Sequence, residues 1–201
     1  MRTKRDIEII KYVEQYKSIT IEQCSKLFFT NNRYGYDQAR KRLSKLKKEG
    51  FLKRYRKDPK SMSIYYIDKP LKIHDLKIRD VLIEFINNFS YVNPKIEFKR
   101  MYDDKEYVID GVFNLDHKIP VCVEIDYTHY TSMEKVRDIL YFFEEQKHRP
   151  YIFIIVKLTQ CELEFHRIGD YSYLYVLPWN LEGISEIFNR INRDIDYFKA
   201  R

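Results

Sequence analysis

The sequence lacks several features that would place it in familiar classes of protein. No apolar run reaches the roughly 18 residues that a membrane span needs, and the first ten residues lack the apolar core of a signal peptide. Cys24, Cys122 and Cys161 lie far apart, and an odd number of cysteines without CxxC spacing fits neither a disulfide framework nor a zinc site. Glycine and proline, with 5 and 6 residues, are too few for a low-complexity chain. We therefore expect a cytoplasmic protein with three reduced thiols and no membrane partner.

Aromatic side chains and an uneven charge are what the sequence has in abundance. Aromatic residues make up 16% of the 201 residues, an apolar supply that a disordered chain would lack. The net charge is +7, but residues 1–70 carry 19 Lys/Arg and 8 Asp/Glu, a net +11, whereas residues 71–201 carry 18 and 22, a net −4. This charge step predicts two domains, residues 1–70 and 71–201, of which the first binds a polyanion.

The spacing of apolar residues in the first third predicts three helices followed by a β-hairpin. The helices cover about residues 4–16, a short stretch after the N-cap Thr20, and residues 34–49. The residues predicted to face inward are Ile7, Ile10 and Val13, then Cys24, Leu27 and Phe28, then Tyr36, Ala39, Leu43 and Leu46. Gly50 is expected to end the third helix in the left-handed conformation. Residues 51–56 and 61–67 flank the turn signal at 57–60, which predicts the hairpin.

Three helices and a hairpin in this order resemble the winged helix-turn-helix superfamily over about residues 3–68. The resemblance implies that the third helix enters the major groove of DNA and that the hairpin, or wing, contacts flanking phosphates. Arg33 and Gln38 would read base edges, and Tyr34 would contact a sugar or a thymine methyl group. The phosphates would be bound by Lys41, Lys45, Lys48, Arg54, Arg56, Lys57 and Lys60. The other interpretations are a solvated lysine-rich helix face and a winged helix that binds protein.

The rest of the sequence predicts elements in the order α-β-β-β-α-β, followed by one more strand and a terminal helix. The segments are residues 74–89, 95–102, 107–115, 119–127, 132–146, 151–156, 173–177 and 181–198. The order resembles the common core of the PD-(D/E)xK, or restriction-endonuclease-like, superfamily. The predicted fold class is therefore α/β (α+β): an N-terminal winged helix-turn-helix followed by a restriction-endonuclease-like α/β domain with a central mixed sheet.

The resemblance reaches four acidic residues and one lysine. Asp110 in the second strand and Glu124 in the third take the places of the motif's two acids, and Glu84 on the preceding helix resembles an extra acid of some members. Asp110 and Glu124 could together hold Mg²⁺, which would activate water. Asp126 stands where the motif has lysine, and Lys135 on the next helix is either the replacement or a solvated side chain. The absent motif lysine favours a degenerate, non-catalytic domain, with catalysis by these five residues as the alternative.

The combination of the two domains resembles the bacterial replication-relaxation family. The residues that carry this resemblance are His74 at the domain junction, Asp110 in its strand, and the stretch Glu124–Thr128. The resemblance implies a role in replication, transfer or transcriptional control of a plasmid, phage or integrative element.

Three functions follow as hypotheses. The first is a double-stranded DNA-binding protein, a homodimer that needs no cofactor for binding. The alternatives are a metal-dependent DNA endonuclease that uses Mg²⁺ and is targeted by the winged helix, and a protein-interaction adaptor. The apolar stripe of the terminal helix either forms the dimer interface or packs on the chain's own sheet. Its members are Ile184, Ile187, Phe188 and Ile191.

Overall fold

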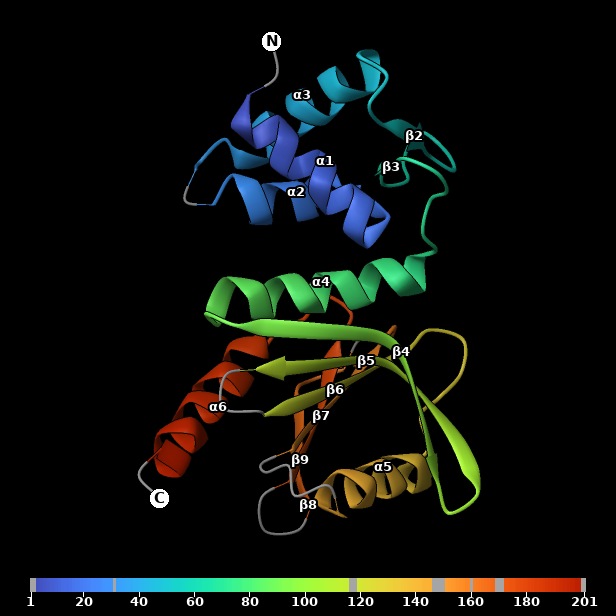
Figure 1. Ribbon diagram of the computed structural model, residues 1–201, viewed down its shortest axis with the longest axis vertical. Helices are drawn as coiled ribbons and strands as arrows, with labels where there is room; N and C mark the ends of the chain where they lie inside the picture. Colours follow the sequence, from blue (N-terminus) through green and yellow to red (C-terminus); the bar gives the residue numbers. More distant parts are fainter. Residues whose placement is uncertain are drawn as a thin grey trace. The chain divides into compact units, whose positions relative to one another are not determined.

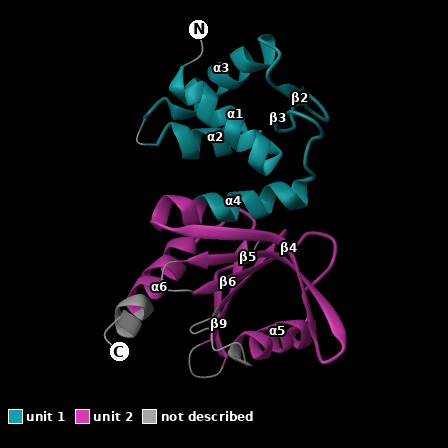
Figure 2. Cartoon of the chain, viewed as in Figure 1, with its two compact units in different colours: residues 1–83 teal, residues 84–201 magenta. Residues whose placement is uncertain are grey.

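The computed structural model describes residues 3–30, 32–115, 119–145, 151–159, 161–168 and 172–199 (Figure 1). The chain divides into two compact units, unit 1 with residues Met1–Ile83 and unit 2 with residues Glu84–Arg201 (Figure 2). Among the described residues there are six helices, a three-stranded antiparallel sheet in unit 1 and a six-stranded mixed sheet in unit 2. The expected mixed α/β class is therefore confirmed. In the same ranges, no helix combines the length and the apolar character that crossing a bilayer would require.

Unit 1 begins with three helices, α1 (Lys4–Tyr16), α2 (Ile21–Phe28) and α3 (Gly35–Lys48). Reciprocal capping boxes begin the first two. Asp6 N donates to Thr3 Oγ1, and Thr3 N donates back to the Asp6 carboxylate at 2.8 Å. Gln23 N and Thr20 Oγ1 form the same pair at the start of α2, with Thr20 N donating to Gln23 Oε1 at 3.0 Å. These side chains satisfy backbone donors that the first helical turn leaves without partners, so the sequence fixes where both helices start.

Gly50 ends α3 as the sequence predicts. Its φ of +82° lies in the left-handed region that glycine tolerates best. Phe51 N donates to Leu46 O at 3.0 Å, and Gly50 N donates to Lys47 O at 3.2 Å, the paired bonds of a Schellman motif. The chain therefore turns away from the helix axis directly before the next strand.

Two of the predicted core positions are wrong. Ile7 is 44% exposed and Tyr36 is 55% exposed. Gly35 lies so close to the end of α2 that an added Cβ would sit 2.8 Å from Phe29 O. This contact puts Gly35 on the inner stripe, and Tyr36, about 100° further round the helix, turns to solvent. The residues that α1 and α3 bury are Asp6, Ile9, Tyr12 and Val13, and Gly35, Ala39, Leu43 and Leu46.

The small sheet of unit 1 has the strand order β1-β3-β2 and is antiparallel throughout. Its strands are β1 (Ser18–Thr20), β2 (Lys53–Tyr55) and β3 (Ile64–Tyr66). The predicted hairpin is confirmed as β2 and β3. The sequence predicts no strand between the first two helices, whereas residues 18–20 pair with β3. This pairing anchors the hairpin to the helical part of unit 1.

The first part of α4 (Ile73–Asn88) belongs to unit 1. The buried Gln23 side chain donates from Nε2 to Leu76 O at 3.1 Å and to Asp80 Oδ1 at 2.7 Å. Leu71 N donates to Ser18 Oγ at 3.0 Å. The sequence predicts a domain boundary at residue 70. Because these bonds attach Leu71 to β1 and the first part of α4 to α2, unit 1 extends to Ile83.

The sheet of unit 2 has the strand order β4-β5-β6-β7-β9-β8. The strands are β4 (Val92–Tyr102), β5 (Lys105–Leu115), β6 (Pro120–Asp126), β7 (Tyr151–Lys157), β8 (Glu164–Ile168) and β9 (Ser172–Pro178). The pairs β6–β7 and β7–β9 are parallel, and the other three pairs are antiparallel. The sequence missed β8, an edge strand whose first four residues are all exposed.

Helices pack on the sheet of unit 2, and the candidate site residues Asp110 and Glu124 follow the last pair of the β5–β6 ladder. On α5 (Met133–Glu145), Val136, Ile139 and Phe143 belong to a core cluster with Cys122 and Phe153. Residue 146, where the sequence ends this helix, lies outside the described residues. On α6 (Ile184–Lys199), the apolar stripe is buried within unit 2, and the rings of Phe188 and Phe85 lie 5.0 Å apart. The stripe is therefore not an exposed dimer interface.

Candidate functional site

The basic surface predicted on unit 1 is exposed. The ten residues proposed for DNA contact lie on the turn before α3, on α3 and on the hairpin. Nine are exposed and the tenth, Lys45, keeps 43% of its side chain accessible. They are Arg33, Tyr34, Gln38, Lys41, Lys45, Lys48, Arg54, Arg56, Lys57 and Lys60. Residues 40–60 contain eleven Lys/Arg and only two acids, Glu49 and Asp58, so this surface carries a strong positive potential.

The acids near α3 neutralise only some of these cations. Arg40 pairs with Asp37 at 3.1 Å, and Lys45 pairs with Glu49 at 3.6 Å. Within the described ranges, no carboxylate pairs with Lys41, Lys48 or Arg54. These cations are available to an external polyanion.

Arg42 differs from its neighbours because it serves the fold of unit 1. Its guanidinium lies 3.3 Å from the carboxylate of Asp6, whose side chain is fully buried. Burial raises the pKa of Asp6, but the hydrogen bonds from Thr3 and the charge of Arg42 outweigh it and hold that pKa below its usual value. The ion pair ties α3 to the start of α1.

The start of α3 presents exposed aromatic side chains. Tyr34 is 62% exposed, the guanidinium of Arg33 lies 5.9 Å from its ring, and Tyr34 N donates to Asn32 Oδ1 at 2.8 Å. Tyr36 is exposed beside them, although the sequence placed it in the core. The signal that could have revealed it is Gly35, because a glycine on a helix stripe often marks a close backbone approach.

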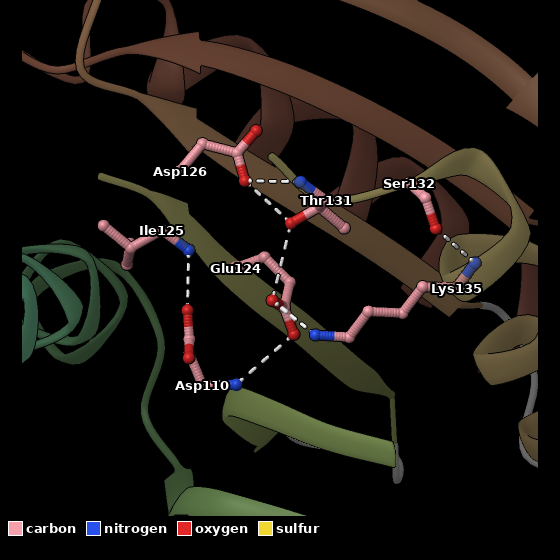
Figure 3. Close-up of polar contacts among 7 residues, drawn as sticks. All are labelled: Asp110, Glu124, Ile125, Asp126, Thr131, Ser132 and Lys135. Carbon is pink, nitrogen blue, oxygen red and sulfur yellow. Dashed lines mark hydrogen bonds and ion pairs between the residues drawn. The ribbon is translucent and has the colours of Figure 1, made fainter. Parts of the chain in front are cut away.

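A second cluster of polar side chains lies where β5 and β6 separate (Figure 3). The β5–β6 pairing ends at Gly111 and Val123. At the next position, hydrogen bonds between side chains and backbone amides replace the backbone pairing. Asp110 Oδ2 accepts from Ile125 N at 2.8 Å, and Asp110 N donates to Glu124 Oε1 at 3.4 Å. The structure therefore brings together the two acids that the sequence predicted as a pair.

Lys135 reaches this cluster from the first turn of α5. Its Nζ lies 2.7 Å from Glu124 Oε2, and its side chain is 26% exposed. Ser132 Oγ accepts from Lys135 N at 3.1 Å, which holds the start of the helix. Lys135 is therefore an ion-pair partner of Glu124 and not a fully solvated side chain. Its role as the replacement for the motif lysine stays a prediction.

Glu124 is 5% exposed and carries an unusual affinity for a proton. Burial and the neighbouring charge of Asp110 raise the pKa of Glu124 to about 7, against the lowering effect of Lys135. Near neutral pH, Glu124 is therefore partly protonated and partly ionised.

Asp126 faces the loop that leads from β6 to α5. Its Oδ1 accepts from Thr131 N at 2.9 Å and from Thr131 Oγ1 at 2.7 Å. Thr131 Oγ1 also lies 3.5 Å from Glu124 Oε2. Thr131 is a member of the cluster that sequence reasoning missed. The only signal was a threonine five residues after an acid at the end of a strand.

The oxygen atoms of the cluster fit Mg²⁺ in part. Mg²⁺ is commonly held by one or two carboxylates with several waters, and Asp110 and Glu124 supply two. In the part of the chain that the structure describes, no three His, Cys, Asp or Glu side chains come together as a metal-binding group. Glu84 lies on α4 and is half-buried. His74 lies on α4 in unit 1, where its Nδ1 is 3.1 Å from Asp75 Oδ1.

The chain was compared with protein-family models, curated protein sequences and solved structures. No protein-family model matches the chain, and no curated protein sequence matches it. Among solved structures, it is similar to a chain of the refined half-complex from a tetradecameric assembly of Thermococcus gammatolerans McrB AAA+ hexamers with bound McrC. The identity is 14% and the TM-score is 0.37, over 66% of this chain and 35% of that chain. This chain thus spans about a third of the length of the chain it matches.

Proposed function

We propose that the chain binds double-stranded DNA through α3 and the β2–β3 hairpin of unit 1. The observation that carries the proposal is the exposed basic surface of residues 40–60. This segment contains eleven Lys/Arg and two acids, and Asp6 of α1 engages one of the cations, Arg42. Lys41, Lys48 and Arg54 have no acidic partner among the described residues. A duplex releases counterions when such cations neutralise its phosphates, which supplies the binding free energy.

The order of elements supports assigning unit 1 as a winged helix-turn-helix. Three helices precede an antiparallel hairpin, and the hairpin pairs with the short strand between α1 and α2. In this assignment α3 enters the major groove and the hairpin contacts neighbouring phosphates. Gln38 and Arg33 read base edges, with Tyr34 against a sugar or a thymine methyl group, and the lysines fix the position of the protein.

The biological role that we propose is replication, transfer or transcriptional control of a mobile genetic element. It rests on the resemblance carried by His74, Asp110 and Glu124–Thr128. The order α4-β4-β5-β6-α5-β7 supports a PD-(D/E)xK-like assignment for unit 2. Unit 2 would serve dimerisation or partner contact, and a homodimer would bind paired half-sites.

Reversal of charge on α3 tests DNA binding directly. We expect Lys41→Glu with Lys48→Glu to lower the affinity for a labelled duplex by at least about a hundredfold at low salt, because two phosphate contacts become repulsive. Fluorescence anisotropy measures this. The matched control is Lys11→Glu with Lys69→Glu, which makes the same charge change at exposed positions of α1 and of the segment after β3. Equal losses in both pairs would contradict a localised interface.

A second candidate function, metal-dependent DNA cleavage, is favoured by one observation. Lys135 Nζ contacts Glu124 beside Asp110, which places a cation at the acidic cluster without the motif lysine. Mg²⁺ bound there would activate water, with Lys135 to stabilise the attacked phosphate. An assay of plasmid nicking with Mg²⁺ or Mn²⁺, which compares the native protein with Glu124→Ala, tests for this activity. Nicking by the native protein that Glu124→Ala abolishes would establish this activity, and the absence of nicking leaves DNA binding as the function.

A further inference from the structure

The tip of the β2–β3 hairpin, residues 57–60, places an acid inside the most basic part of the chain. Residues 53–60 contain five Lys/Arg and one acid, Asp58, which is exposed. A carboxylate at this position opposes the approach of a phosphate. Charge alone would therefore make Asp58 unfavourable for DNA binding, and its contacts explain its presence.

Both carboxylate oxygens of Asp58 are bound within the turn. Oδ1 accepts from Lys60 N and from Ser61 N, each at 2.8 Å, and Oδ2 accepts from Ser61 Oγ. Ser61 N also lies 3.2 Å from Asp58 O. Aspartate followed by proline suits the first two positions of a type I turn, because the ring of Pro59 fixes φ. The hydrogen bonds from Ser61 Oγ and Lys60 N lower the pKa of Asp58, so the acceptor stays ionised at neutral pH.

A further bond ties the two sides of the hairpin below the tip. Arg56 Nε donates to Ser61 O at 2.7 Å. This bond uses one of the donors of the guanidinium and leaves its two terminal amino groups for other partners. Lys57 directly precedes the fixed turn and Lys60 lies within it, and both are exposed. The tip therefore presents three cations on a backbone that is already ordered.

We propose that the hairpin tip is a preformed phosphate-binding site for the duplex and that Asp58 is its positioning residue. The proposal rests on the proposed function of unit 1. Ordering a flexible segment on binding reduces affinity, and a segment fixed beforehand avoids that loss. The order that Asp58 gives to the tip outweighs the repulsion of its charge.

Two substitutions of Asp58 separate order from charge. Asp58→Asn removes the charge and keeps Oδ1 as an acceptor for Lys60 N and Ser61 N. Asp58→Ala removes both. Charge alone predicts that both variants bind DNA more tightly and equally. The proposal predicts opposite directions, with Asp58→Asn about twofold to threefold tighter than the native protein and Asp58→Ala about threefold weaker.

The measurement is the anisotropy of a labelled B-form duplex of mixed sequence, titrated at low salt with the full chain. The matched control is Glu49→Gln, which removes an exposed acid at the end of α3 and is expected to tighten binding like Asp58→Asn. Hydrogen exchange at the Ser61 amide reports the turn, and it should accelerate in Asp58→Ala only. Equal affinities of the two Asp58 variants, or an unchanged Ser61 amide in the Ala variant, would overturn the positioning role. A native protein that binds no duplex would instead remove the function on which it rests.

Discussion

At the scale of single residues, the acidic cluster of unit 2 is a balance of charges around the buried Glu124. Asp110 and Glu124 lie side by side where their strands separate, and the ammonium group of Lys135 contacts Glu124. A buried carboxylate beside another carboxylate favours its protonated form. The pKa of Glu124 near 7 is the consequence, and it makes the stability of unit 2 depend on pH.

The substitution Glu124→Gln tests the raised pKa of this residue. The native group has a folded-state pKa of about 7 against a usual value of 4.5. The fold favours the protonated form of Glu124, so this group contributes its full stabilisation of the fold below pH 4.5. That contribution to the free energy of unfolding is lost as the pH rises through 7. The loss amounts to about 3 kcal/mol. Glu124→Gln, which carries no titrating proton, should lack this loss.

The single tryptophan, Trp179, allows unit 2 to be followed alone. Urea unfolding monitored by its fluorescence, with a chelator present, should give a native midpoint that falls between about pH 4 and pH 8. The midpoint of Glu124→Gln should fall much less. Parallel pH profiles for the two proteins would contradict the assigned pKa.

The sequence could predict part of this cluster, for a physical reason. Alternation along a strand places Glu124 and Asp126 on one face, and two adjacent strands bring Asp110 beside them. Thr131 and the contact of Lys135 could not be predicted, because both depend on the path of the loop between β6 and α5. That path is set by the bonds of Thr131 to Asp126, which exist only once the loop has folded.

At the scale of elements, the helix starts follow from local chemistry and two short strands do not. Thr3, Thr20 and Gly50 act within a few residues of themselves, so their effects can be read from the sequence. β1 has three residues and pairs with β3, a strand distant in the sequence, and β8 has five residues and pairs with β9, the next strand along the chain. Propensity over so few residues carries little information, and tertiary pairing decides.

Gln23 connects α2 to α4, and its substitution tests that connection. It is 1% exposed, closes the capping box of α2, and bonds to α4 at Leu76 O and Asp80. Gln23→Leu leaves the buried Leu76 carbonyl and the Thr20 amide without these bonds. We expect a loss of about 2–4 kcal/mol in the stability of unit 1.

Circular dichroism during urea unfolding follows both units, and Trp179 fluorescence follows unit 2 alone. The difference between the two signals measures the loss in unit 1. The control is Gln15→Leu at an exposed position of α1, which should change stability by less than about 0.5 kcal/mol. Equal behaviour of the two variants would show that Gln23 does not hold α2 and α4 together.

At the scale of the whole molecule, charge is divided between the two parts of the chain. The net positive charge lies in the first third, where acids are few, and the remainder is mildly acidic. An acidic remainder is repelled by a polyanion, so binding concentrates on α3 and the hairpin. The sequence alone predicts this difference in net charge, because it follows from residue counts and not from the fold. Which cations are engaged by acids, such as Arg42 with Asp6, required the structure.

The most direct test of the central claim is the salt dependence of duplex binding by the native protein. Seven Lys/Arg of α3 and the hairpin are assigned to phosphate contact, and each neutralised phosphate contributes about −0.9 to the slope of log affinity against log salt. Seven such contacts predict a slope of about −6. A slope near zero, or no binding at low salt, would contradict the assignment of this surface to DNA.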